Sequence, residues 1–189
     1  MPEPPTADPS QTIGEISTDE FMQIMLTNAL SPMRVIEQFA AQVTAGGLIG
    51  VMSSGQGSIA NNESGQRELY RGSKAALNMF MRSLAARPTM KARPLVTMAP
   101  GWIKTALGGP DAPYTIEETI PLLVNVLLEK QQRPGLEISR LSRQYGSLVM
   151  ITPRATAPQP PTFGNRQHPA PAPPARWQAG RAVLRCPRR

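Results

Sequence analysis

Tyr70 and Lys74 are the side chains whose types and spacing could do chemistry. They lie four residues apart in a segment that reads as a helix through Leu84, and this spacing places both on one helical face. A phenol, with an ordinary pKa of about 10, is a poor proton donor or acceptor at neutral pH, but a neighbouring cation favours the phenolate. The pair therefore predicts a general acid/base. On spacing alone a solvated helix face is the commoner explanation, so the surrounding elements must decide between the two interpretations.

Two short apolar runs flank this helix in the sequence. The run at 47–52 ends in a serine pair that includes Ser54, and the run at 94–99 leads into the segment 100–105. Such runs are typical of buried parallel strands. A strand, a helix and a second strand within about 50 residues form a βαβ unit, and open parallel sheets bind ligands beyond the carboxyl ends of their strands. We expect Ser54, Tyr70 and 100–105 to border one crevice.

Residues 18–43 predict a long amphipathic helix that begins with a Ser-x-x-Glu capping box at 17–20. Pro32 lies inside this helix and has no N–H group, so the carbonyl of Asn28 loses its helical partner. The freed carbonyl and the amide side chain of Asn28 predict a held water that forms one link in a proton path to Lys74. The alternative is a proline kink that has no chemical role.

Four elements in this order resemble the short-chain dehydrogenase/reductase family. They are Asn28, Ser54, the Tyr-x-x-x-Lys motif at 70–74 and the Pro-Gly-x-x-x-Thr motif at 100–105. The resemblance covers roughly residues 13–137. Residues 57–62 and 101–110 are similar to the C-factor-like, carbonyl-reductase-like branch of the family. The resemblance implies an α/β fold of the Rossmann-like type, with a doubly wound parallel sheet.

The resemblance also implies a role for each residue of the predicted site. Tyr70 exchanges the proton, and Lys74 activates it and binds the ribose of the nicotinamide cofactor. Ser54, in preference to Ser53, hydrogen-bonds the substrate oxygen, and Asn28 holds the relay water. The implied cofactor is NAD or NADP, and the implied substrate is a small carbonyl or alcohol compound.

Further residues are implied at the nicotinamide end of the cofactor and around the substrate. The implied cofactor-binding residues are Tyr70, Lys74, Pro100, Gly101, Ile103 and Thr105. Residues 108–118 and a following helix at 116–130 correspond to a substrate-binding loop and a lid helix. The side chains of Trp102, Leu107 and Tyr114 either line the substrate pocket or pack the lid.

The family opens with a strand, a glycine-rich turn and a helix that hold the cofactor's pyrophosphate. Residues 1–16 contain one glycine and four prolines, and nothing before residue 48 reads as a buried strand. Gly55 and Gly57 follow a strand, but a loop succeeds them, so they are interpreted as part of the serine loop. We therefore expect a partial fold, truncated at the N-terminus, that lacks its dinucleotide-binding half. Such a chain alone would bind nicotinamide cofactor weakly or not at all.

Three segments are predicted: an irregular segment at 1–16, the C-terminal half of a Rossmann-like domain at 17–137, and a disordered tail at 138–189. The tail holds nine arginines and no acidic residue, whereas residues 1–137 hold 11 basic and 13 acidic residues. The net charge of +7 therefore originates in the tail. A proline- and arginine-rich composition cannot bury a core. The tail is either a basic arm for nucleic acid or a frame-shifted sequence. The second interpretation is favoured, so nucleic acid is not an expected partner.

Cysteine and histidine usage narrows the function classes. Cys186 and His168 are the single cysteine and the single histidine, and both lie in the predicted tail. An intramolecular disulfide is therefore excluded, and no metal site is expected. The sequence shows no apolar run of about 18 residues and no signal-peptide pattern, so we expect a cytoplasmic protein without a membrane partner.

The leading prediction is an NAD(P)-dependent oxidoreductase that moves a hydride between nicotinamide and a carbonyl or alcohol carbon, with Tyr70 as general acid/base. The first alternative is a catalytically inactive fragment that binds partners through its long helices, which family members use to form homo-oligomers. The second alternative is a nucleic-acid binder that acts through the basic tail.

Overall fold

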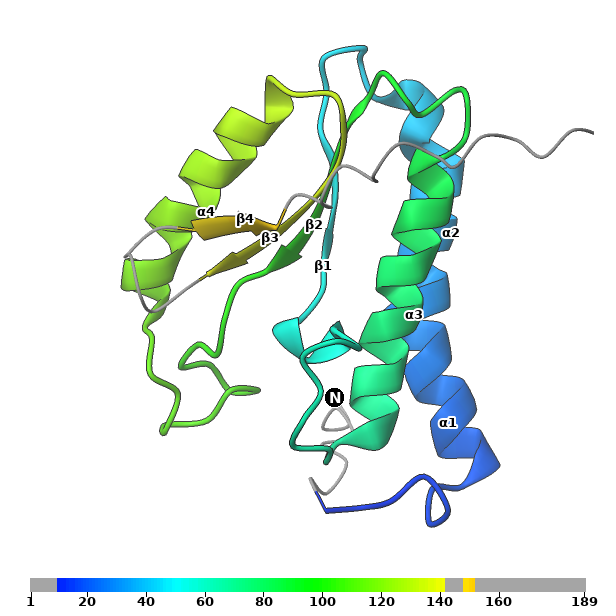
Figure 1. Cartoon of the computed structure of the whole chain (residues 1–189), viewed down its shortest axis with the longest axis vertical. Helices are drawn as coiled ribbons and strands as arrows, with labels where there is room; N and C mark the ends of the chain where they lie inside the picture. The colour runs from blue at the N-terminus through cyan, green and yellow to red at the C-terminus, as the bar shows by residue number, and fades with distance from the viewer. Residues whose placement is uncertain (1–9, 142–147, 152–189) are drawn as a thin grey trace, which may run out of the picture. The chain divides into compact units, whose positions relative to one another are not determined.

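A four-stranded sheet lies at the centre of the computed structural model, which describes residues 10–141 and 148–151. Its strands are β1 (Ile49–Met52), β2 (Pro94–Ala99), β3 (Gly135–Leu141) and β4 (Leu148–Ile151), in the spatial order β1-β2-β3-β4. The first three strands are parallel, and β4 is antiparallel to β3 (Figure 1). The predicted α/β class and the two predicted strands around the helix of Tyr70 are confirmed.

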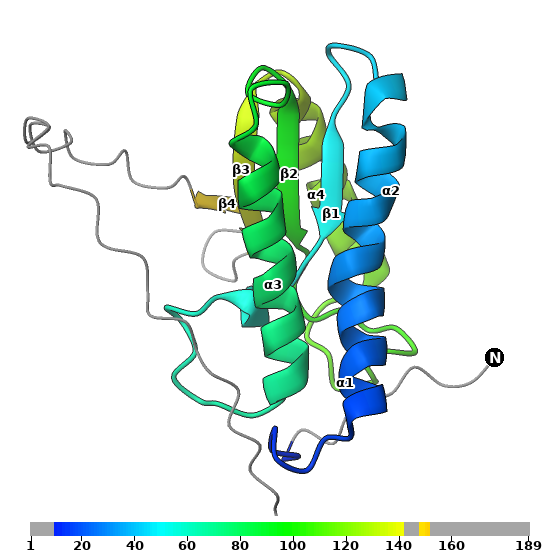
Figure 2. The same ribbon diagram turned by 90° about the vertical axis from the view of Figure 1, so that its right-hand side faces the viewer.

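Helices cover the two faces of the sheet unequally. One face carries α3 (Glu68–Ala85) and a nearly continuous rod, whose parts are α1 (Thr18–Met25), η1 (Leu26–Leu30), α2 (Ser31–Phe39) and η2 (Ala40–Gln42). The other face carries α4 (Ile116–Gln131) (Figures 1 and 2). A short 3₁₀ turn, η3 (Gly55–Gly57), follows β1. The parallel strands are therefore connected through helices, as the βαβ pattern predicted.

The hydrophobic core lies between the rod, α3 and the sheet. Leu77, Met81 and Leu84 of α3 and Leu95 of β2 are fully buried, and Met33 and Ile36 of α2 join the same cluster. These side chains recur on α3 at intervals of three and four residues, which is the spacing of one helical face. The core thus fixes α3, the helix of Tyr70 and Lys74, against β1 and β2.

Pro32 shapes the long rod in a way that differs from the predicted kink. The Ser17 side chain caps α1 by accepting a hydrogen bond from the Glu20 N–H at 3.2 Å, as predicted. Residues 26–30 then form a π-helical turn, in which the Ser31 N–H bonds the Leu26 carbonyl. A proline cannot donate to the carbonyl four residues earlier, and a widened turn accommodates this loss without breaking the rod. Asn28 lies in this turn.

The predicted start of the tail at residue 138 is wrong. Strand β3 continues to Leu141 and pairs with the whole length of β2, from Gly135 opposite Pro94 to Arg140 opposite Ala99. Ser139 is completely buried within this pairing. Composition did not indicate this strand, because the arginine-rich part of the sequence begins within it. Cys186, His168 and the rest of the predicted tail beyond residue 151 lie outside the described residues.

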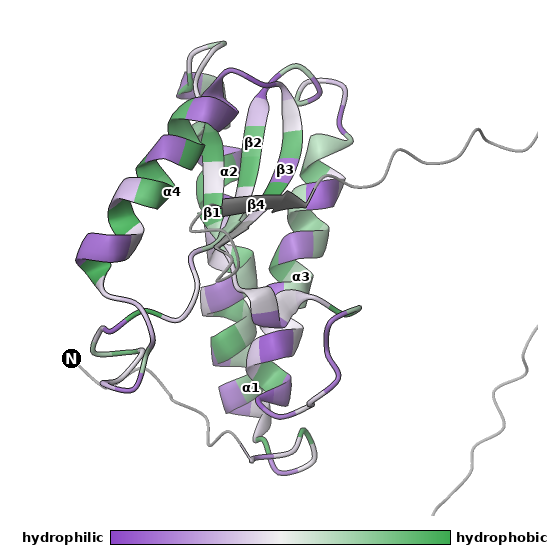
Figure 3. Cartoon of the chain, turned by 60° about the vertical axis from the view of Figure 1, so that its left-hand side comes forward, coloured by the Kyte–Doolittle hydropathy of each residue, from purple (hydrophilic) through white to green (hydrophobic). Residues whose placement is uncertain are grey.

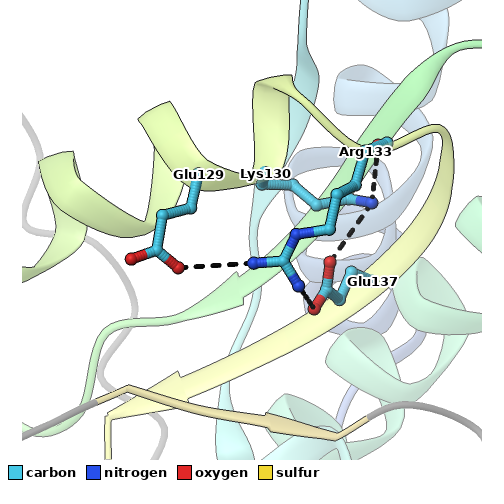
Figure 4. Close-up of polar contacts among 4 residues, drawn as sticks. All are labelled: Glu129, Lys130, Arg133 and Glu137. Carbon is cyan, nitrogen blue, oxygen red and sulfur yellow. Dashed lines mark hydrogen bonds and ion pairs between the residues drawn. The ribbon is translucent and has the colours of Figure 1, made fainter.

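A buried ion pair fastens α4 to β3. The Lys130 ammonium lies 3.2 Å from a Glu137 carboxylate oxygen and donates to the Arg133 carbonyl at 3.0 Å. The Arg133 guanidinium lies 3.7 Å from the other Glu137 oxygen and 3.3 Å from Glu129 (Figure 4). Lys130 and Glu137 are both almost fully buried. Since a buried charge is costly unless it is paired, this cluster fixes where the end of α4 meets the sheet.

Candidate active site

Tyr70 and Lys74 meet at the carboxyl end of β1. The Lys74 Nζ atom lies 5.8 Å from the centroid of the Tyr70 ring and donates a hydrogen bond to the Met52 carbonyl oxygen at 3.2 Å. Burial lowers the pKa of Lys74 from its ordinary value of 10.5, because desolvation disfavours the charged form. The predicted pair is thus brought together, with the ammonium over the face of the phenol ring.

A strained turn fixes where α3 begins. Gly65, Gln66 and Arg67 all have positive φ, at 63°, 58° and 49°. The left-handed region costs a non-glycine residue about 1–2 kcal/mol, a cost that Gln66 and Arg67 both carry. A right-handed helix cannot extend toward the N-terminus through three residues of this conformation. Arg71 holds the turn, since its guanidinium donates to the Gln66 carbonyl at 2.8 Å and to the Ser64 hydroxyl at 3.2 Å. The helix therefore starts at Glu68, and Tyr70 falls in its first turn.

The two adjacent serines differ in what their hydroxyl groups do. Ser53 is buried and donates its hydroxyl hydrogen to the Asn78 Oδ1 atom at 2.6 Å. Ser54 is half-buried, and its hydroxyl accepts a hydrogen bond from the Gln56 N–H at 3.1 Å. A hydroxyl that accepts still has one hydrogen to donate. The Ser54 hydroxyl therefore keeps a hydrogen that it can donate, and its role toward a substrate oxygen stays a prediction.

Gly57 brings the serine loop against the helix of the tyrosine and lysine. A Cβ atom at this position would lie 2.8 Å from the Lys74 backbone carbon and 2.9 Å from the Lys74 Cβ atom. The Gly57 carbonyl accepts a hydrogen bond from the Asn78 amide at 3.2 Å. Sequence reasoning assigned Gly57 and Asn78 no positioning role. The Gly-x-Gly spacing after the serine pair was the available signal for Gly57, and Asn78 lies one helical turn after Lys74.

Asn28 reaches the helix of Tyr70 through Ser73. Its amide donates to the Ser73 hydroxyl at 3.0 Å, and that hydroxyl donates to the Tyr70 carbonyl at 2.8 Å. Ser73 is completely buried, so this chain of hydrogen bonds ties the π-helical turn to the first turn of α3. Ser73 was missed in the sequence, although it lies between the two motif residues. A water held by Asn28 stays a prediction.

The segment after β2 leaves the sheet beside the serine loop, because β1 and β2 are neighbours and the Ser53 N–H bonds the Met98 carbonyl at 2.6 Å. Pro100 is half-buried, and Gly101 has a φ of 93°, a conformation that favours glycine. The segment then folds back on itself. The Thr105 hydroxyl accepts from the Gly108 N–H at 2.9 Å.

Contacts within this loop hold its side chains close to its own backbone. The Trp102 indole donates to the Gly108 carbonyl at 2.7 Å, and a Cβ atom on Gly108 would collide with the Ile103 carbonyl oxygen. The Lys104 N–H bonds the Tyr114 carbonyl at 2.8 Å. Trp102 and Leu107 are exposed, and Tyr114 is half-buried. Contacts of Pro100, Gly101, Ile103 and Thr105 with a cofactor therefore stay predictions.

Within residues 10–141 and 148–151, no three His, Cys, Asp or Glu side chains are grouped so that they could bind a metal ion. The helices of the same residues include none with the length and apolar character needed to cross a membrane.

Comparison with known proteins identifies the family. A family model described as enoyl-(acyl carrier protein) reductase matches residues 6–123. The chain is 32% identical over 117 residues to the C-signal protein of Myxococcus xanthus, a match that covers 61% of this chain and 70% of that protein. The chain belongs to the short-chain dehydrogenase/reductase family, and the predicted resemblance is confirmed.

Solved structures share the same fold. A short-chain dehydrogenase/reductase from Burkholderia multivorans, crystallised with bound NADP, has 64% identity and a TM-score of 0.68 over 70% of this chain. A carbonyl reductase from Pseudomonas aeruginosa PAO1 in complex with NADP has 32% identity and a TM-score of 0.61 over 68% of this chain. The matches span 58% and 56% of those two proteins, so this chain corresponds to somewhat more than half of each.

Proposed function

We propose that the protein is an NAD(P)-dependent oxidoreductase that interconverts a carbonyl compound and an alcohol, with Tyr70 as general acid/base. The observation that carries this proposal is the position of Lys74, whose ammonium lies over the Tyr70 ring beside the serine loop, at the carboxyl end of a parallel strand. The NADP-bound relatives support the choice of cofactor.

The residues present fit the ribose and nicotinamide end of the cofactor. An ammonium has three N–H donors, and the Met52 carbonyl takes one from Lys74, so donors remain for a ribose diol. The residues present fit the pyrophosphate end of the cofactor less well. Within the described residues, Gly55 and Gly57 form a 3₁₀ turn against α3, whereas a phosphate loop leads into a helix N-terminus. The bound nicotinamide would supply or accept the hydride.

Proton handling follows from the protein's own groups. In the direction of reduction, the Tyr70 hydroxyl donates its proton to the substrate oxygen, and the Ser54 hydroxyl hydrogen-bonds that same oxygen. The Lys74 ammonium favours the phenolate that remains. A water held by Asn28 would return the proton through Lys74. In the direction of oxidation, each proton moves the opposite way.

The test is NADPH-dependent reduction of a panel of aliphatic and aromatic ketones by the full chain. We expect Tyr70→Phe to lower turnover by about 10²–10⁴-fold, the usual contribution of a positioned acid/base. Ser83→Ala, which removes an exposed hydroxyl from the same helix outside the site, is the control and should retain activity. Undiminished turnover in Tyr70→Phe would remove Tyr70 from the mechanism. NADPH affinity, measured separately, should change little in either variant.

A second proposal concerns self-association through the long helices, which is also how an inactive fragment would bind partners. The outer surface of the rod and α3 exposes large apolar side chains, namely Phe21, Met22, Val35, Phe39, Met79 and Phe80. Exposed apolar residues grouped on one face are typical of an interface. Light scattering of the purified chain would measure its mass. A monomer at every concentration tested would contradict this proposal.

A further inference from the structure

Asn78 binds the serine loop at two points, where the serine loop is the segment 53–57 between β1 and the end of η3. The Ser53 hydroxyl donates to the Asn78 Oδ1 atom at 2.6 Å, and the Asn78 Nδ2 atom donates to the Gly57 carbonyl at 3.2 Å. A side-chain amide has one acceptor oxygen and two N–H donors, so a single asparagine can make both bonds. Ser54 therefore lies between two residues that are each bonded to α3.

Asn78 extends the stripe of polar side chains that carries the acid/base pair. Tyr70, Lys74 and Asn78 follow one another at intervals of four residues, which places them along one side of α3. Lys74 donates to the Met52 carbonyl, immediately before the serine loop. Figure 3 shows hydrophilic and hydrophobic segments alternating along α3, whose apolar side chains fill the core. The polar stripe thus contacts the chain from the end of β1 to η3.

The contact at Gly57 leaves no free space between the serine loop and α3. A Cβ atom on Gly57 would lie 2.8 Å from the Lys74 backbone carbon and 2.9 Å from the Asn78 Nδ2 atom. Backbone packing therefore limits how close the loop comes to the helix, while the two bonds of Asn78 limit how far it moves away. The Ser54 hydroxyl accepts from the Gln56 N–H, a bond that lies within the loop and does not join Ser54 to the helix.

We propose that Asn78 is a positioning residue, which sets where the Ser54 hydroxyl lies relative to the Tyr70 hydroxyl. The inference rests on the proposed function, in which these two hydroxyl groups bind the same substrate oxygen. Asn78 acts through Ser53 and Gly57, the bonded residues on either side of Ser54. A displacement of about 1 Å at a reacting group can lower a rate about 10²-fold, so a small movement of the serine loop would have a large effect.

This role predicts which kinetic constant changes. The groups proposed to bind the nicotinamide and its ribose are the Lys74 ammonium and the segment 100–105, and the Asn78 side chain bonds the serine loop instead. Loss of the Asn78 amide should therefore lower kcat, because Ser54 and Tyr70 no longer meet at the substrate oxygen, while the KM for NADPH changes little. A role in stability alone would lower kcat only until stability is restored.

Kinetics of the full chain, with NADPH and the ketone that it reduces fastest, give the first measurement. Asn78→Leu replaces the amide by an apolar side chain of the same branching, removes both bonds and should lower kcat by about tenfold to a hundredfold. Asn125→Leu is the matched control, because it makes the same substitution at an exposed position of α4; it should keep the kcat of the wild type. An unchanged kcat in Asn78→Leu would overturn the proposal.

A double variant separates positioning from stability. Asn78→Leu deprives the buried Ser53 hydroxyl of its acceptor, and adding Ser53→Ala removes that hydroxyl. Replacing both partners of a hydrogen bond by apolar groups is nearly neutral for stability, so the double variant should unfold at nearly the same urea concentration as the wild type. Its kcat should stay low, since the Gly57 carbonyl has lost its bond to α3. A kcat that returns with stability would show a structural role and overturn the proposal.

Hydrogen exchange examines the serine loop without turnover. The N–H groups of Gly57 and Ser58 bond the Ser54 and Gly55 carbonyls and close η3. Both amides should exchange about tenfold faster or more in the double variant, whereas amides of β2 should exchange as in the wild type. Unchanged exchange at Gly57 and Ser58 would overturn the proposal even if the chain showed no activity. A chain that reduces no ketone but shows the faster exchange would contradict the proposed function alone.

Discussion

The two faces of the sheet differ in how completely they are covered. On the face of α2 and α3, Leu77, Met81 and Leu84 are fully buried, and the helix of Tyr70 is fixed by core packing. On the face of α4, Gly50 and Met52 of β1 are exposed, and so are Ile116, Ile120, Val124 and Leu128 along one flank of the helix. The difference shows that the helix of the acid/base pair belongs to the fully packed layer.

The largest expected effect is on stability and tests the packed face of α2 and α3. Leu77→Ala should lower the free energy of unfolding by about 3–5 kcal/mol, because it leaves a cavity at a fully buried site. Leu128→Ala on the α4 flank should change it by about 0.5 kcal/mol or less, since that side chain is 58% exposed. Urea denaturation of both variants measures the two values. Similar losses would contradict the difference between the faces.

The buried ion pair tests how α4 is attached. Lys130→Met should cost about 3 kcal/mol, because it leaves Glu137 buried with only the more distant Arg133. Adding Glu137→Leu removes the unpaired charge and should recover most of the loss. Denaturation midpoints of the single and double variants measure this coupling. A double variant no more stable than Lys130→Met would show that the pair does not act as a unit.

A third prediction concerns the contact between the serine loop and α3. Gly57→Ala should destabilise the protein by about 1–3 kcal/mol, because its methyl group would overlap the Lys74 backbone. Gly72→Ala lies two residues before Lys74 with open space around it and should stabilise the helix by about 0.5–1 kcal/mol. Thermal unfolding distinguishes the two signs. A harmless Gly57→Ala would mean that the loop does not press on the helix.

The smallest effect concerns the titration of Lys74. Its pKa in the folded protein is lower than the ordinary 10.5, so between those two values the unfolded chain binds more protons. Stability from this group therefore rises with pH through that window. Relative to Lys74→Met, the wild type should gain stability as the pH rises through that window toward 10.5. A pH-independent difference would contradict the burial of the amine.

The sequence predicted the residues of the candidate site better than it predicted the contacts that position them. Tyr70, Lys74 and the strands around them were predictable because motif spacing and apolar runs depend on nearby residues. Ser73 and Asn78 were not, since their hydrogen bonds to Asn28 and Ser53 join residues 45 and 25 positions apart. The start of α3 at Glu68 depends on backbone conformations at Gln66 and Arg67 that residue type does not disclose.

Strand β3 escaped prediction for a different reason. Its end lies where basic composition begins, and pairing with β2 overrides that local preference. The exposure of one side of α4 could not be predicted either. Apolar residues at helical spacing indicate that a face is buried, but they do not show which element covers it. Only the contact of Gln131 with Gly46 reveals which side of the helix faces β1.

The most direct test of the central claim is a titration of the purified chain with NADPH, followed by nicotinamide fluorescence. The account predicts weak but saturable binding that Lys74→Met reduces further, by about tenfold or more. Lys91→Met, which removes an exposed lysine outside the site, should bind NADPH like the wild type. Binding that Lys74→Met leaves unchanged would contradict the account.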